Sequence, residues 1–214
     1  MYKLVLYGLM ILCFISLVLS ALSILPYSVI SLIESFLAIT VVCYLSNAIF
    51  AKLFKVETNV ESASISSFIL FLLLLPLSSL LDLWFFVLAG VVAMASKYFL
   101  AIRKKHIFNP SAFSLVVIGL CGSGLGLWWV GSTAMLIPTA ILGFLVLRKV
   151  KRFTMFGVFL ASSMLSMSIF ALFQGMSLYD VLSQAFLSGS IIFLGTIMLT
   201  EPFTTPPQKY SQII

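Results

Sequence analysis

Long runs of apolar residues, separated by short polar stretches, dominate the sequence. The runs show no strict alternation with polar residues and approach or exceed about 20 residues, which is typical of helices that cross a bilayer rather than of barrel strands. The pattern predicts eight apolar segments, at residues 4–25, 27–50, 65–81, 83–102, 111–121, 127–147, 153–173 and 181–199. We therefore expect an all-α integral membrane protein, a polytopic helix bundle that forms a single membrane domain over residues 1–214.

Two of the eight segments are short for a membrane crossing. The segment at 65–81 is interrupted at Pro76, and the segment at 111–121 is followed by the glycine-rich stretch 122–126. At 1.5 Å per residue, the second of these reaches about 17 Å, whereas the hydrocarbon core is about 30 Å thick. We expect about eight transmembrane or re-entrant helices, and the sequence leaves full crossing and re-entry both open for these two.

Composition excludes a soluble domain. Of the 214 residues, 62% are hydrophobic and 8% are charged, with a mean hydropathy of +1.23, whereas a soluble domain carries about 25% charge. The net charge of +6 comes from cations clustered at the ends of apolar segments. Such clusters are typical of topology signals, so we expect no nucleic-acid partner. The three cysteines lie in or beside apolar runs without ligand spacing, so we expect no metal site.

The distribution of charge also predicts how the chain lies in the membrane. If the segments at 65–81 and 111–121 both cross, one side receives every Lys and Arg except Lys97, which lies close enough to snorkel to that side. The other side receives only Asp82 and Asp180. The positive-inside rule then places both termini in the cytoplasm of a multi-pass protein of the cell (inner) membrane.

A weak internal repeat is visible. Residues 62–66 (SASIS) resemble residues 111–115 (SAFSL), and each stretch starts a short segment that is followed by a tryptophan and a helix with a basic end. Membrane proteins built from repeats often have their sites where short or broken helices meet. Chance similarity between short apolar segments explains the pattern equally well.

The polar stretch after the fourth segment contains the first candidate site. It holds cations at 103–105, the only histidine, His106, and the pair Asn109-Pro110. Asparagine is a good N-cap and proline fits the first helical turn, so the pair predicts a helix start. That start is either structural alone or, beside the cations, a site for an anionic or hydrogen-bonding ligand. His106 can join Asn109 only if the chain turns between them.

Further polar positions stand out elsewhere in the chain. Glu34 and Lys97 lie in or near apolar segments, where ionisable side chains are functional candidates. The last apolar segment ends at residues 200–202 (TEP), and Thr204 and Thr205 follow it. This ending is either a capped helix leading into a rigid, proline-rich exit or part of a site.

Two motifs resemble the NqrB/RnfD family, the flavin-carrying membrane subunits of the sodium-translocating NADH:quinone reductase and of Rnf ferredoxin:NAD complexes. Residues 105–113 (KHIFNPSAF) look like the NP motif of that family, and residues 199–207 (LTEPFTTPP) look like its TDPxTxP ending. Residues 128–132 (WWVGS) and 147–153 (LRKVKRF) resemble a shorter branch, in which a cytoplasmic FAD/NAD(P)-binding domain follows the membrane region. The resemblance covers roughly residues 30–214.

The resemblance implies a membrane subunit of a flavin-dependent electron-transport complex, with FMN or riboflavin as the cofactor. In the family, polar residues around the NP motif contact the flavin, which here points to Asn109 and His106. The predicted cofactor-binding set is completed by Lys97, Thr200, Glu201, Thr204 and Thr205. Well-known members attach FMN covalently to a threonine in an SGAT motif. The nearest string here is residues 131–134 (GSTA), so we expect non-covalent flavin.

The resemblance also implies partners. These are the lipid bilayer, other electron-transport subunits, and a cytoplasmic NAD(P)H- or ferredoxin-linked reductase domain, on another chain or in a soluble part beyond residue 214. The chain would be a subunit of an oxidoreductase without a catalytic side chain of its own, with or without coupled ion transport. Two other hypotheses stay open. The short segments, Glu34 and Lys97 favour an ion or small-solute channel or transporter, and the missing SGAT motif favours a cofactor-free assembly subunit.

Overall fold

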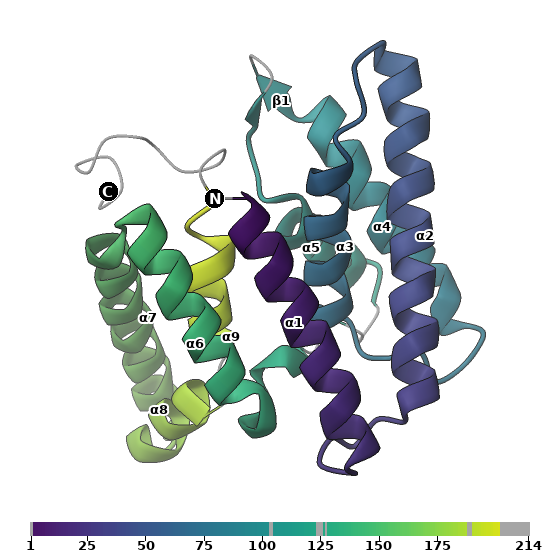
Figure 1. Ribbon diagram of the computed structural model, residues 1–214. Helices are drawn as coiled ribbons and strands as arrows, with labels where there is room; N and C mark the ends of the chain where they lie inside the picture. The colour runs from purple at the N-terminus through teal and green to yellow at the C-terminus, as the bar shows by residue number, and fades with distance from the viewer. Residues whose placement is uncertain (1, 103–104, 123–125, 127, 188–189, 202–214) are drawn as a thin grey trace. The chain divides into compact units, whose positions relative to one another are not determined.

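The computed structural model describes residues 2–102, 105–122, 126, 128–187 and 190–201, and most of them are helical (Figure 1). The elements in chain order are α1 (Tyr2–Ala21), α2 (Val29–Phe54), α3 (Val60–Leu73), α4 (Asp82–Phe99), β1 (Ala101–Ile102), β2 (Lys105–His106), α5 (Pro110–Leu120), η1 (Trp129–Gly131), α6 (Thr133–Val150), α7 (Phe153–Gln174), α8 (Leu178–Leu187), α9 (Ser190–Phe193) and η2 (Leu194–Met198). In the described residues, the one pair of strands is the short antiparallel hairpin of β1 and β2. The expectation of a helical chain is confirmed.

Five of the described helices, α1, α2, α4, α6 and α7, are long and apolar enough to cross a membrane. α8 and the helix formed by α9 and η2 pass the same test together as a pair bent by 53°, which would make a sixth span. α3 has 14 residues and α5 has 11, so they are only about 21 Å and 17 Å long. The helices are compatible with a multi-pass membrane protein. The full count of eight crossings is not reached, because the two short segments stay short.

Two expected segments begin or end elsewhere because of local capping and turns. The segment expected at 65–81 begins at Val60, because the side-chain oxygen of Asn59 accepts a hydrogen bond from the Ser62 N–H over 2.9 Å. The segment expected at 83–102 ends at Phe99, and its last two residues form β1. There the N–H of Ile107 donates to the carbonyl of Leu100 over 2.9 Å, which closes the hairpin.

Two later segments also differ from expectation. The segment expected at 127–147 begins at Thr133, because Trp128 has a left-handed backbone (φ 53°) and the following residues form the 3-10 turn η1. The segment expected at 181–199 is not one helix. Its described parts are α8, α9 and the wider π-helical turn η2.

The chain divides into two compact units, residues 2–129 and residues 130–214. In the first unit α3 is the central helix, because every residue from Ala63 to Leu73 is buried and α1, α2, α4 and α5 all pack against it. Figure 1 shows α3 lying between α1 and α2. Its apolar residues occur on all faces, which is the pattern of a buried helix. Phe36 on α2 packs against Phe68 and Phe71 on α3, with ring centroids 5.4 Å apart in both pairs.

In the second unit, α6 and η2 approach closely. A Cβ added at Gly143 on α6 would lie 2.9 Å from the Cβ of Thr196 on η2, so only glycine fits there without a shift. The Thr196 hydroxyl donates to the Ile192 carbonyl over 2.6 Å, and the Thr200 hydroxyl donates to the Thr196 carbonyl over 2.5 Å. Hydroxyls on consecutive turns therefore satisfy carbonyls in and beside the π-helical turn.

Candidate functional site

Asn109 starts α5, as the sequence predicts. Its side-chain oxygen accepts hydrogen bonds from the N–H groups of Ser111 (3.1 Å) and Ala112 (3.2 Å), and Pro110 occupies the first helical turn. These contacts satisfy two of the N–H groups that have no partner inside the helix. The remaining polar group of this half-buried side chain is its NH2, which is a hydrogen-bond donor.

Hydroxyl groups anchor the start of α5 against two other helices. The buried Ser111 donates to the Ser66 carbonyl of α3 over 3.4 Å, and the buried Ser114 donates to the Ala89 carbonyl of α4 over 2.7 Å. These side-chain bonds link α5 to α3 and α4 in a region that lacks water. The position of Asn109 is therefore set by three helices together.

Lys97 reaches the start of α3 from the last turn of α4. Its Nζ donates to the carbonyl of Ser62 over 2.7 Å and to the hydroxyl of the same residue over 2.9 Å. Ser62 and Ser66 are one turn apart on α3, a rise of about 6 Å. Because Ser111 binds at Ser66, the structure brings Lys97 and the beginning of α5 onto adjacent turns of the same helix.

His106 lies in β2, where its backbone pairs with Ala101. The chain then bends at residues 107–108 before α5 begins, so the connection from His106 to Asn109 is turned rather than extended. This meets the condition that the sequence sets for the two side chains to converge. His106 is half-buried.

The far end of α3 has polar contacts that sequence reasoning did not identify. The indole N–H of Trp129, which is buried, donates to the Phe71 carbonyl over 2.8 Å, and the backbone N–H of Trp128 donates to the Leu73 carbonyl over 2.9 Å. The last carbonyls of a helix have no partner inside it, so these two residues complete the short helix. The tryptophan pair at the end of a glycine-rich stretch is the available sequence signal.

The second motif lies in the other unit, 130–214. Thr200 is fully buried, and its carbonyl accepts a hydrogen bond from Nη1 of Arg152 over 3.1 Å. Burial lowers the pKa of the Arg152 guanidinium from its ordinary value. Glu201 follows as a half-buried residue. Thr204 and Thr205, like Arg103 and Lys104, lie outside the described residues.

Arg152 is the contact that the sequence interpretation missed in this unit. The sequence analysis treats it as one of a group of topology cations, yet its guanidinium makes a specific bond to the chain end 48 positions away. The predicted set is thus divided, with Lys97 and Asn109 brought together in one unit and Thr200 and Glu201 placed in the other.

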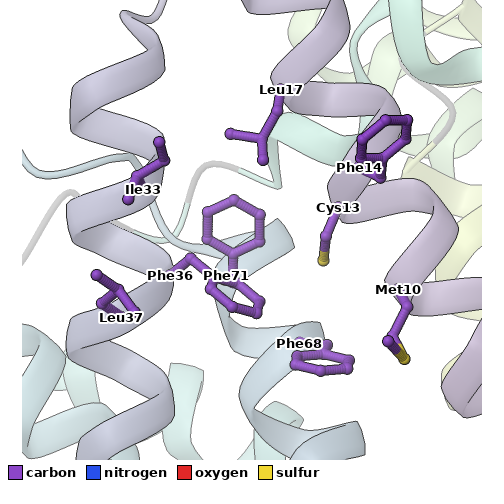
Figure 2. A pocket seen from close by; sticks show the side chains of 9 residues that line it. All are labelled: Met10, Cys13, Phe14, Leu17, Ile33, Phe36, Leu37, Phe68 and Phe71. Carbon is purple, nitrogen blue, oxygen red and sulfur yellow. The ribbon is translucent and has the colours of Figure 1, made fainter.

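The first unit also contains two pockets. An apolar pocket of about 250 Å³ lies between α1, α2 and α3, and Figure 2 shows its nine lining side chains. A second pocket of about 530 Å³ lies between α2 and the chain segment before α4, and its polar lining comes from Glu34, Ser78 and Ser79. Leu37 on α2 lines both pockets.

Within the part of the chain that the structure describes, no group of three or more His, Cys, Asp or Glu side chains could hold a metal ion. No protein-family model matches the chain, and no curated protein matches it either. The argument for function therefore rests on the motifs and on the geometry of the described residues.

Proposed function

We propose that this chain is a membrane subunit of a flavin-dependent electron-transport complex of the NqrB/RnfD type. The observation that carries the proposal is the motif at 105–113, which turns into a half-length helix at Asn109 beside the Lys97 ammonium. A flavin-binding residue needs a fixed position. The anchoring of α5 by Ser111 and Ser114 supports that requirement.

The groups at this end of the first unit suit a flavin by their chemistry. The Asn109 NH2 can donate a hydrogen bond to a carbonyl oxygen or a ring nitrogen. The Lys97 ammonium and the positive ends of α3 and α5 favour negative charge, either on a phosphate or on a reduced ring. The bound flavin would supply the redox chemistry, while these residues bind and orient it.

The remaining predicted residues belong to the second unit in this proposal. Thr200 and Glu201 end η2 beside Arg152, and they would contact the cofactor or a partner subunit from that ending. The partners are other electron-transport subunits and a cytoplasmic NAD(P)H- or ferredoxin-linked reductase domain. The chain would lie in the cell membrane with both termini in the cytoplasm, because the cations then face that side.

The experiment is an absorption spectrum of the detergent-purified chain, recorded before and after acid precipitation. A flavin band that is released into the supernatant is the expected result for a non-covalent cofactor. A band that stays in the pellet would overturn the non-covalent assignment. A well-folded sample that neither carries a flavin nor takes one up, alone or with its co-purified partners, would refute the proposal.

A channel or transporter is the second candidate function. It is favoured by α3 and α5, two short helices that continue as non-helical chain, since such interrupted helices often surround transport sites. Its test is solute or ion flux in proteoliposomes, with Glu34→Gln as the variant expected to abolish it. Absence of both flavin and flux would leave the assembly-subunit hypothesis.

A further inference from the structure

Glu34 is a carboxylate near one end of a long apolar helix. It lies five residues after Val29, the first residue of α2, a rise of about 8 Å. Its side chain is exposed, and it makes no hydrogen bond or ion pair with any residue that the structure describes. An ionised carboxylate at this depth is costly without a cation beside it.

The neighbouring acid, Asp82, has a different environment. One of its carboxylate oxygens accepts hydrogen bonds from the N–H and the hydroxyl of Ser78 and from the N–H of Ser79, at 2.8–3.1 Å. Asp82 is therefore satisfied by its own turn. The Ser78 hydroxyl donates to Asp82, so its oxygen still has a lone pair with which it can accept a bond in the pocket that Glu34 lines.

The apolar pocket opens on the adjacent face of α2. Figure 2 shows Leu17 and Ile33 at one end of this pocket and Met10 and Phe68 at the other. Ile33 precedes Glu34 in the sequence, so the polar pocket lies at the level where the apolar pocket begins. Together the two pockets offer a carboxylate and hydroxyls near the helix ends, followed by an apolar channel that leads deeper along α1 and α2.

We propose that these two pockets bind one phospholipid with a primary ammonium headgroup, phosphatidylethanolamine. The ammonium donates hydrogen bonds to the Glu34 carboxylate and to the Ser78 oxygen, and an acyl chain fills the pocket between α1, α2 and α3. The argument for this occupant is charge complementarity, because Glu34 provides the negative charge that the headgroup requires. The proposal is independent of the flavin.

The headgroup must provide the selectivity. Acyl chains are available everywhere in a bilayer, so filling the apolar pocket from lipid distinguishes poorly between lipids that carry the same chains. A choline headgroup is cationic but has no N–H to donate, and a glycerol headgroup leaves a net negative lipid beside a carboxylate. Binding should therefore follow the headgroup in the order ethanolamine, choline, glycerol.

The test is native mass spectrometry of the full chain after equilibration with equimolar phosphatidylethanolamine and phosphatidylcholine of identical acyl chains. The wild type should retain the ethanolamine lipid about tenfold more than the choline lipid, the effect of about one charge-assisted hydrogen bond. Glu34→Gln should remove this preference. Glu57→Gln is the matched control, because Glu57 is an exposed carboxylate in the loop after α2, and it should keep the preference.

Two further arms keep the proposal falsifiable if Glu34→Gln alters the fold. Glu34→Lys should reverse the preference toward phosphatidylglycerol. Free ethanolamine in millimolar excess should not displace the lipid, because it lacks the acyl chain. No headgroup preference in the wild type, an unchanged preference in folded Glu34→Gln protein, or displacement by free ethanolamine would each overturn the proposal.

Discussion

Replacing Trp129 by Phe should destabilise the first unit, residues 2–129, more than its size suggests. The indole N–H of Trp129 donates to the Phe71 carbonyl over 2.8 Å, and its side chain is only 3% exposed. Its ring also meets Phe71 and Tyr27 edge-on, with centroids 5.3 Å and 5.9 Å apart. Phe71 lies in the last turn of α3, so its carbonyl depends on a donor from outside the helix.

The expected loss has two parts. Removing the donor leaves a buried carbonyl unsatisfied, which costs about 1–3 kcal/mol. Shrinking the indole to a phenyl ring leaves a void, which adds about 1 kcal/mol because the surrounding contacts are lost even where lipid replaces water. We expect a total loss of about 2–4 kcal/mol in the free energy of unfolding of this unit.

The assay is reversible unfolding in mixed micelles of increasing SDS fraction, followed by far-UV circular dichroism. Trp84→Phe is the control, because Trp84 is 62% exposed on α4 and makes no hydrogen bond with any described residue, and it should change the free energy by less than about 0.5 kcal/mol. Replacing Trp129 by benzothienylalanine, which keeps the shape but has sulfur instead of N–H, isolates the hydrogen bond. Equal effects of the substitutions at Trp129 and Trp84 would refute the reasoning.

Two further predictions concern the second unit, residues 130–214. Gly143→Ala should cost about 1–3 kcal/mol because the new methyl group has no space against η2, whereas Gly157→Ala, with open space around it, should be neutral or slightly stabilising in the same unfolding assay. Arg152→Gln should cost about 1–2 kcal/mol through the lost bond to the Thr200 carbonyl. Arg148→Gln removes the same charge from an exposed position and should shift the midpoint by little, and similar shifts for both would contradict the specific contact.

Local chemistry explains what could be predicted from sequence. The apolar runs that became α1, α2, α6 and α7 are long and uniformly hydrophobic, and no competing structure buries their backbone groups in lipid. Asn109-Pro110 is a capping signal that acts over three or four residues, so it identified the start of α5 without any tertiary information. The short length of the segment at 111–121 was visible for the same reason.

The features that escaped prediction depend on contacts between distant positions. Trp129 reaches a carbonyl 58 positions earlier, and Arg152 reaches one 48 positions later. The hairpin that shortened the fourth segment pairs Ala101 with His106 across a basic stretch, which in the sequence looked like a topology signal. Apolar pattern alone also joined α8 to the helix that follows it, because both parts are hydrophobic enough for a single span.

The central claim is that the start of α5 contributes to a flavin site. The most direct measurement is a titration of the purified chain with FMN or riboflavin, followed by flavin fluorescence, for the wild type and for Asn109→Ser. Serine keeps the N-cap acceptor but lacks the NH2 donors, so the variant should keep its unfolding midpoint and bind flavin about tenfold more weakly. Asn59→Ser, which changes the matching cap of α3, is the control and should leave flavin affinity unchanged. Failure of the wild-type chain to bind flavin, or equal affinity in folded Asn109→Ser protein, would contradict the claim.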